Sequence, residues 1–325
     1  MVQLDWGVVS RESIRMPGPM NPLSMATIDF SRLRVDRDEL KGVAPHKPLL
    51  LLAVLDWFEA GGILADEIWL CPDLVVRFQN YWPIVAARRG NRGDIRLPFH
   101  ALATDKVWQV FDSEGRPSRA RQTSTRAVLS HGFQRLLQSE PARRALRRLL
   151  IARYFSPGEQ WSLAEAVGLP LGDLTVGADR VEEDAAYYEE RRRLGRTARF
   201  RNSVITGYVF TCALTGYRIT TAEQVSVIEA AHIHSLSRSR NNEPENGLAL
   251  SPTAHALFDL GLWSIRDDFT IIVKPEKSFT ESSPVGSFSL RAFANRPLHF
   301  ERRAVLRPHV RHLLAHRAQH GFAHR

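Results

Sequence analysis

The sequence predicts an α+β protein of two domains, a mixed α/β domain in the N-terminal half and a smaller domain of strands, loop and short helix toward the C-terminus. With 325 residues, 44% of them hydrophobic and 24% charged, the chain has the length and composition of two folded domains. Short apolar runs separated by Gly, Asp and Asn fill its first half. A charged helical stretch then precedes a second series of β-branched runs.

The N-terminal domain is expected to contain one buried helix, followed by strands and further helices. The helix is predicted at residues 48–60 (PLLLLAVLDWFEA), which are apolar and end at Gly61-Gly62. The shorter apolar runs that follow indicate strands and loops mixed with helix, around Trp69, 78–82, 97–102 and 107–111.

Shifts in composition divide the chain into four segments. The Pro-rich start has no secretory pattern and predicts a flexible extension, while residues 182–201 (EEDAAYYEERRRLGRTARFR) predict a charged helix between domains. We therefore expect four segments: an extension at 1–25, an N-terminal domain at 26–160, a linker with a charged helix at 161–200 and a C-terminal domain at 201–325.

Charge and cysteine content narrow the class of partner and the compartment. The formal net charge of +9 favours a polyanionic partner such as nucleic acid, with a merely basic surface as the alternative. Only Cys71 and Cys212 are present, so neither a disulfide framework nor a four-cysteine zinc knuckle can form. Because no apolar run reaches membrane-spanning length, we expect a cytoplasmic protein without a membrane partner.

Candidate chemistry is concentrated in residues 229–259 (EAAHIHSLSRSRNNEPENGLALSPTAHALFD). His232 falls on a predicted strand, Asn246 at the end of a polar loop, and His255 in a short predicted helix. Phosphodiester hydrolysis needs a base to deprotonate water, a cation to neutralise charge on the phosphate, and a group that orients the base. The segment offers one candidate for each role.

This order of strand histidine, Asn-Gly-Leu and helix histidine followed by Phe-Asp resembles the HNH, or ββα-metal, nuclease family over about residues 200–275. The resemblance implies that His232 is the general base and that Asn246 holds its imidazole or the local backbone. It also implies that His255 binds a divalent metal, for which carboxylate and imidazole ligands favour Mg²⁺ or Mn²⁺.

The metal ligands depart from the family pattern at Ala231, where many members carry a ligand directly before the base. Strand periodicity puts Glu229 on the same face as Ala231, so Glu229 is the expected substitute. Asp259 lies four residues after His255 and shares its helical face, either as a third ligand or as a group that supports His255. The expected metal-site residues are therefore Glu229, His255 and Asp259.

Segments of the first half resemble the sulfur-binding domains of phosphorothioate-dependent restriction endonucleases, over about residues 30–155. The resemblance lies in HKPLLLL at 46–52, in LPF at 97–99 and in the run that follows. A sulfur that replaces a non-bridging phosphate oxygen is larger, softer and less hydrated, while the unit keeps its negative charge. A reader of this mark therefore needs an apolar dimple flanked by cations.

That resemblance implies the residues of the reader site. Leu97, Pro98 and Ala101 match the dimple, with leucine where the family has tyrosine, and His46 and Lys47 match the contacts to the DNA backbone. Four arginines in the preceding stretch RRGNRGDIR are candidates for holding phosphates or a guanine edge: Arg88, Arg89, Arg92 and Arg96.

Together these observations predict an endonuclease that reads phosphorothioate-modified double-stranded DNA and cuts near the mark. Cutting a duplex needs two active sites, so a homodimer is expected. One alternative is a reader of methylated or hydroxymethylated cytosine, for which Tyr81, Trp82 and Trp69 could supply an aromatic cage. The other is a non-catalytic DNA-binding protein, an interpretation that Ala231 keeps open.

Five of the twelve histidines lie in the last 25 residues. Their spacing of three and four residues aligns most of them along one side of a helix. The pattern predicts a basic helix that contacts phosphate or a neighbouring domain, with a metal cluster as the alternative.

Overall fold

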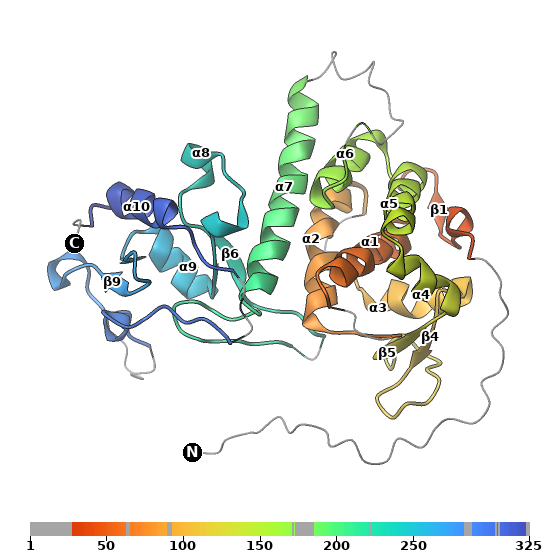
Figure 1. Cartoon of the computed structure of the whole chain (residues 1–325), viewed down its shortest axis with the longest axis horizontal. Coiled ribbons are helices and arrows are strands. Elements are labelled where there is room, and N and C mark those ends of the chain that lie inside the picture. The colour runs from red at the N-terminus through yellow and green to blue at the C-terminus, as the bar shows by residue number, and fades with distance from the viewer. Residues whose placement is uncertain are drawn as a thin grey trace.

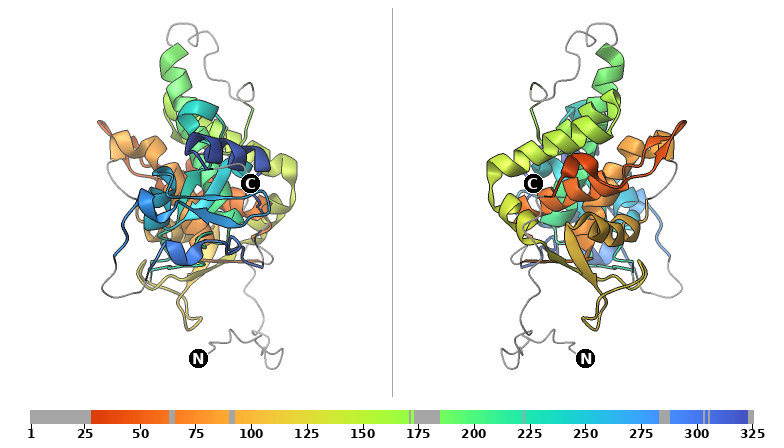
Figure 2. Two further views of the ribbon diagram at one scale, coloured as in Figure 1. Left: turned by 90° about the vertical axis from the view of Figure 1, so that its left-hand side faces the viewer. Right: turned by 90° about the vertical axis from the view of Figure 1, so that its right-hand side faces the viewer.

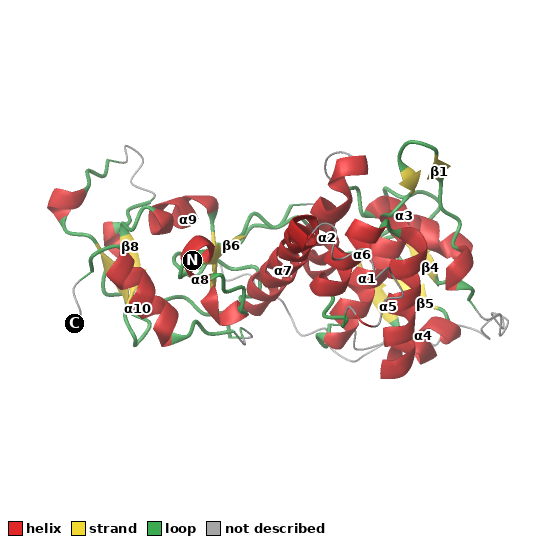
Figure 3. Cartoon of the chain, turned by 90° about the horizontal axis from the view of Figure 1, so that it is seen from above, coloured by secondary structure: helices red, strands yellow, loops and turns green. Residues whose placement is uncertain are grey.

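The computed structural model describes residues 28–62, 66–89, 93–170, 172, 185–221, 223–282, 288–302, 304 and 306–322. Its two halves lie on either side of a long helix, α7 (Ala185–Gly207), as Figures 1 and 3 show. The predicted α+β class is confirmed, because helices are combined with small antiparallel sheets. The extension expected at 1–25 lies outside the described residues. Within them, no helix is long and apolar enough to cross a membrane.

The N-terminal half is mainly helical and contains two small antiparallel sheets. One sheet pairs two short strands, and the other has the strand order β3-β5-β4. The elements are β1 (Arg37–Asp38), β2 (Gly42–Val43), α1 (His46–Glu59), β3 (Glu67–Trp69), α2 (Pro72–Arg89), α3 (Arg96–Ala101), β4 (Trp108–Phe111), β5 (Arg126–Leu129), α4 (His131–Gln138), α5 (Glu140–Tyr154) and α6 (Pro157–Ala166).

Helix α1 forms the centre of the first hydrophobic core. Every residue from Leu49 to Leu55 is fully buried, so this helix is apolar on all sides rather than amphipathic. The helix ends before Gly61, whose φ of +76° is a left-handed conformation that favours glycine. The predicted helix at 48–60 is thereby confirmed. Of the shorter runs, 78–82 and 97–101 are helical and only the runs at Trp69 and 108–111 are strands.

Helix α7 belongs to both hydrophobic cores. Ala198 packs into the first core, whereas Phe200, only two residues further on, packs into the second. The first core also includes Leu163 and Ala164 of α6, so it extends past the boundary expected at residue 160. The side views in Figure 2 show the N-terminal end of α7 extending beyond the other described helices. The charged linker helix therefore contributes side chains to the hydrophobic cores of both halves.

The C-terminal half is built from two β-hairpin-like pairs and short helices. Its helices and strands are β6 (Glu229–His232), α8 (Leu236–Ser239), β7 (Gly247–Leu250), α9 (Pro252–Asp259), β8 (Trp263–Ile265), β9 (Ile271–Val273) and α10 (Val310–Gln319). Strand β6 pairs antiparallel with β7, and β8 with β9. The order β6, β7, α9 is the strand, strand, helix arrangement that the motif predicts.

The histidine-rich helix α10 packs into the second core, so its histidines do not form a basic outer face. His312 and His316 are only 4% and 3% exposed. The His316 ring stacks on Phe258 at 3.8 Å, and its Nδ1 lies 2.8 Å from Ser264 Oγ. Burial lowers the pKa of His316 to about 3 and that of His312 to about 4, so both rings are neutral at physiological pH. These two residues serve as core side chains.

Candidate active site

Strand pairing brings the three motif residues to one end of the C-terminal half. His232 ends β6, and the register pairs it with Gly247, the residue after Asn246. Ser251 caps α9 by accepting a hydrogen bond from the backbone N–H of Ala254, so α9 begins directly after β7 and carries His255 back toward β6. A β-hairpin followed at once by a helix therefore holds the motif together.

Gly247 has a packing role in this arrangement. A Cβ at this position would lie 2.3 Å from Cγ2 of Val204 and 3.1 Å from the Phe200 ring, both on α7. The Asn-Gly pair is thus explained by the close approach of α7 to β7, because the φ of Gly247 is −123° and any residue can adopt it.

His232 is held on two sides, and one of its ring nitrogens has no hydrogen-bond partner within the described residues. Its ring stacks on Phe200 with centroids 3.9 Å apart, and Nε2 lies 3.0 Å from Oδ1 of Asn242. Because an amide oxygen only accepts, Nε2 carries the proton and Nδ1 keeps its lone pair. Burial lowers the pKa of His232, an effect that the bond to Asn242 opposes, so the ring is neutral and able to accept a proton.

Asn242 is a residue of the candidate site that sequence reasoning missed. It stands in a polar loop (RSRNNEPEN), where nothing in the spacing distinguishes it from Asn241. Only the folded loop places its amide oxygen against the imidazole.

Asn246 is fully buried and holds the loop backbone, not the imidazole. Its Oδ1 accepts from the N–H of His234 at 2.8 Å, and its Nδ2 donates to the carbonyls of His234 at 2.9 Å and Asn241 at 3.0 Å. Of the two roles considered from sequence, these contacts correspond to the second, support of the local backbone. The amide thereby fixes the loop that presents Asn242 to His232.

His255 lies between two carboxylates. Its Nδ1 is 2.8 Å from Oε2 of Glu229, and its Nε2 is 3.5 Å from Oδ2 of Asp259. The Glu229 and Asp259 side chains are 50% and 64% exposed, whereas Ala231 is fully buried. Glu229 therefore does not share the environment of Ala231 as strand parity implied. As the first residue of β6, it reaches outward to the helix instead.

The three expected metal-site residues are in contact, but each ring nitrogen of His255 already faces a carboxylate. No group of three or more His, Cys, Asp or Glu side chains in the described ranges is arranged to hold a metal ion. The donor set nevertheless suits a hard divalent cation, because it combines carboxylate oxygens with one imidazole. The exposure of both carboxylates leaves them free to exchange their contacts with His255 for a cation.

The expected dimple residues lie on the short helix α3. Leu97 is 40% exposed, Ala101 is half-buried and Pro98 is buried. Leu97 and Ala101 are four residues apart and share one face of the helix, so this face offers a small apolar surface. Arg92 lies outside the described residues. Pro98 faces the core, which leaves Leu97 as the main exposed apolar group.

Two of the arginines expected around this surface, Arg96 and Arg88, differ in exposure and in their ion-pair partners. Arg96 is partly exposed and pairs with Asp94 at 3.3 Å. Arg88 instead belongs to the end of α2 and forms a two-bond ion pair with Glu159 at 2.6 and 3.0 Å. Arg88 therefore joins α2 to α6 through this ion pair.

Lys47 is buried and bonded within the protein, so the structure gives no support to its expected contact with DNA. It is 8% exposed, and its Nζ donates to Oδ2 of Asp105 at 2.6 Å and to the carbonyl of Arg34 at 2.7 Å. Its neighbour His46 is half-buried, with its ring centroid 5.0 Å from that of Trp82. Lys47 lies in the first turn of α1, and this helix is buried on all sides over the residues that follow, so the Lys47 side chain is enclosed as well.

Comparison with known families matches one segment in each half of the chain. Residues 212–266 match the HNH endonuclease family, and residues 86–171 match the ScoMcrA-like DNA sulfur-binding domain. The chain therefore contains an HNH endonuclease domain and a DNA sulfur-binding domain. The second match includes α3 with Leu97, Pro98 and Ala101, and it begins after His46 and Lys47.

Among solved structures, the chain is similar to one titled "Modification dependent TagI restriction endonuclease". The two share 24% sequence identity with a TM-score of 0.29, over 38% of this chain and 37% of that chain. The similarity thus spans little more than a third of either protein. No curated protein matches the chain.

Proposed function

We propose that the chain is a metal-dependent endodeoxyribonuclease that recognises phosphorothioate-modified double-stranded DNA and hydrolyses phosphodiester bonds near the mark. The observation that carries this proposal is the presence of an HNH endonuclease domain and a DNA sulfur-binding domain in one chain. The first supplies a reaction, and the second supplies a target. The net charge of +9 suits a DNA partner, and we propose the cytoplasm as its place of action.

In the proposed reaction His232 is the general base. Its Nδ1 accepts a proton from the water that attacks the phosphorus, while Asn242 keeps the Nε2–H bonded and so fixes the tautomer. The stacked Phe200 ring limits rotation of the imidazole. Asn246 acts one step removed, by holding the loop that carries Asn242.

Glu229, His255 and Asp259 are the residues that would hold the divalent cation, Mg²⁺ or Mn²⁺. When bound, such a cation neutralises the charge that develops on the phosphate and on the leaving oxygen. The contacts of Glu229 and Asp259 with His255 support this assignment, because they bring an imidazole and two carboxylates together.

Recognition of the mark is assigned to the exposed face of α3. Leu97 and Ala101 offer the apolar surface that a weakly hydrated sulfur favours, and Arg96 offers a charge to the phosphate backbone. Reading of a modified cytosine is less well supported. Tyr81 is fully buried and Trp82 is 5% exposed, so neither can close on a flipped base. Trp69 is 51% exposed, but a single ring does not make an aromatic cage.

We further propose a homodimer on DNA, because one HNH site cuts one strand of the duplex. Light scattering of the protein free and bound to a phosphorothioate duplex measures this directly. A monomer in both states would contradict the dimer without contradicting the nuclease.

The proposed function is tested with wild type and His232→Ala on three plasmids of one sequence, which are unmodified, phosphorothioate-modified or cytosine-methylated. Wild type with Mg²⁺ or Mn²⁺ is expected to cut only the phosphorothioate plasmid, and chelation with EDTA should stop cutting without preventing binding. Cleavage of the methylated plasmid alone would favour the rival reader. If wild type binds DNA but never cuts it, the chain is a non-catalytic DNA-binding protein.

A further inference from the structure

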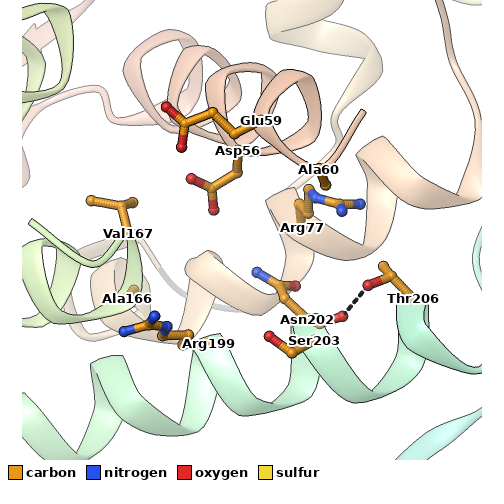
Figure 4. A pocket seen from close by; sticks show the side chains of 10 residues that line it. All are labelled: Asp56, Glu59, Ala60, Arg77, Ala166, Val167, Arg199, Asn202, Ser203 and Thr206. Carbon is orange, nitrogen blue, oxygen red and sulfur yellow. Dashed lines mark hydrogen bonds between the residues drawn. The ribbon is translucent and has the colours of Figure 1, made fainter. Parts of the chain in front are cut away.

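Two cavities meet on the face of α7 that lies between the halves. One, of about 470 Å³, separates α7 from the loop before Asn246 and is lined by Arg199, Phe200, Arg240 and Asn242, among others. The second, of about 230 Å³, lies between α7 and the helices of the first half and is shown in Figure 4. Arg199 and Ser203 line both, so they form the common wall.

The first cavity, which we call the α7 cleft, contains two arginines without a protein partner among the described residues. Arg199 and Arg240 are exposed, and neither side chain makes a hydrogen bond or ion pair with any residue of the described ranges. Arg196 also lines the cleft but is paired with Glu189 at 2.5 Å. Guanidinium groups match phosphate oxygens in geometry and charge, so two unpaired ones on a single cleft favour an anionic oxygen ligand.

Two carboxylates, Glu165 and Glu243, line the same cleft, and neither pairs with its arginines. They limit the net positive charge there, so the cleft suits a single phosphate and not a long stretch of backbone. An exposed carboxylate beside a phosphate site also weakens phosphate binding. Removing the charge of that carboxylate should therefore strengthen binding, whereas removing an arginine should weaken it.

The cleft lies next to the candidate base. Phe200 and Asn242 both line it, and these are the side chains that stack on His232 and bond to its Nε2. Arg201, one residue further along α7, is close enough for its charge to act on the pKa of His232. A ligand in the cleft would therefore rest against the residues that hold the imidazole.

We propose that the α7 cleft binds one backbone phosphate of the DNA strand that is cut, with Arg199 and Arg240 as its ligands. This inference rests on the proposed function and adds to it a DNA contact on the linker helix, outside both matched domains for Arg199. The linker helix would then position substrate as well as join the domains. The ordinary phosphate ion shares this chemistry, and the experiment separates the two sources.

The test measures binding of a short, fluorescein-labelled, unmodified duplex in EDTA across a salt series, for wild type, Arg199→Ala, Arg240→Ala and the double variant. Losing the one phosphate contact in the double variant should reduce the slope of log affinity against log salt by about 0.9, and each single variant should give a smaller reduction. Each single variant should also bind on the order of 10-fold more weakly at low salt. Arg199→Lys and Arg240→Lys, which keep the charge, should recover most of the slope.

The matched control is Arg193→Ala, an exposed arginine of the same helix that does not line the cleft. It should leave the slope unchanged, while Glu243→Gln should strengthen binding. Equal slopes for wild type and the double variant, or equal reductions for Arg193→Ala and Arg199→Ala, would overturn the proposal. So would inorganic phosphate protecting the cleft arginines from phenylglyoxal while duplex DNA does not.

The same measurements separate this inference from the proposed function. The binding measurements need neither DNA cleavage nor a modified duplex. A wild type that does not cut DNA would therefore refute the proposed nuclease activity, and the salt slopes would still test whether the cleft binds phosphate. Conversely, unchanged slopes in an enzyme that cuts phosphorothioate DNA would refute only the cleft.

Discussion

Replacing Asn246 with alanine should destabilise the nuclease half strongly, because the amide is fully buried and makes three hydrogen bonds. The substitution leaves the N–H and carbonyl of His234 and the carbonyl of Asn241 without their partner. At about 1 kcal/mol for each bond, the expected loss is about 3 kcal/mol of the free energy of unfolding. Since Asn246 holds the loop that presents Asn242, the variant should also cut DNA far more slowly at temperatures where it stays folded.

Hydrogen exchange measures this effect locally when peptides that cover β6 and β7 are followed through a urea series. Asn241→Ala is the matched control, because its side chain makes one bond, from the N–H of Glu243 at 2.7 Å, at an exposed site. That variant should lose at most about 1 kcal/mol. Equal losses for the two variants, or a stable Asn246→Ala with normal cleavage, would refute the role given to Asn246.

Three further perturbations have defined outcomes. Because burial lowers the pKa of His316 to about 3, its contribution to stability is complete above about pH 6.5 and is lost as the pH falls toward 3. Urea unfolding should show that this residue has cost about 1.4 kcal/mol of the free energy of unfolding by about pH 5.5. A free energy of unfolding that does not change with pH in this range would contradict the burial of a neutral His316. Gly247→Ala should cost about 1–3 kcal/mol, because the new Cβ would meet Val204. Gly172→Ala is its control in thermal unfolding, since a Cβ there meets nothing within 4 Å, and equal melting temperatures would refute the packing argument. Lys47→Met should lower the free energy of unfolding by about 3–5 kcal/mol, because it leaves Asp105 buried without its cationic partner. The DNA affinity of the folded protein should not change. Weaker DNA binding without a loss of stability would show that Lys47 contacts DNA.

The parts of the site that local sequence determines were predictable. The strand, the loop end and the helix are where they were predicted, with His232, Asn246 and His255 on them in that order. Each of these elements is indicated by the residues directly beside it in the sequence. The contact of Asp259 with His255 also follows from the four-residue helical spacing. These inferences need no knowledge of distant packing.

Contacts between distant residues were not predictable in the same way. Lys47 at the start of α1 has the sequence context of an exposed cation, and its partner Asp105 is 58 residues away. Asn242 meets His232 only through the shape of an irregular loop. The histidines of α10 follow the pattern of a basic helix, yet His312 and His316 are buried in the core. His316 stacks on Phe258 and bonds to Ser264, both distant in the sequence.

The apolar runs at 78–82 and 97–101 show a further limit. Both are compatible with strand or helix by periodicity alone, and both are helical, in α2 and α3. Packing against α1 decides between the two. The consequence for function is direct, because a helical α3 buries Pro98 and exposes Leu97.

Mapping the cut ends on a phosphorothioate plasmid by sequencing tests the central claim most directly, since it reads the target and the reaction in one measurement. If the sulfur-binding and HNH domains act together, ends produced by wild type should cluster at a narrow range of distances from each mark, and His232→Ala should produce none. Ends scattered without regard to the marks, or the same ends on unmodified plasmid, would contradict the account.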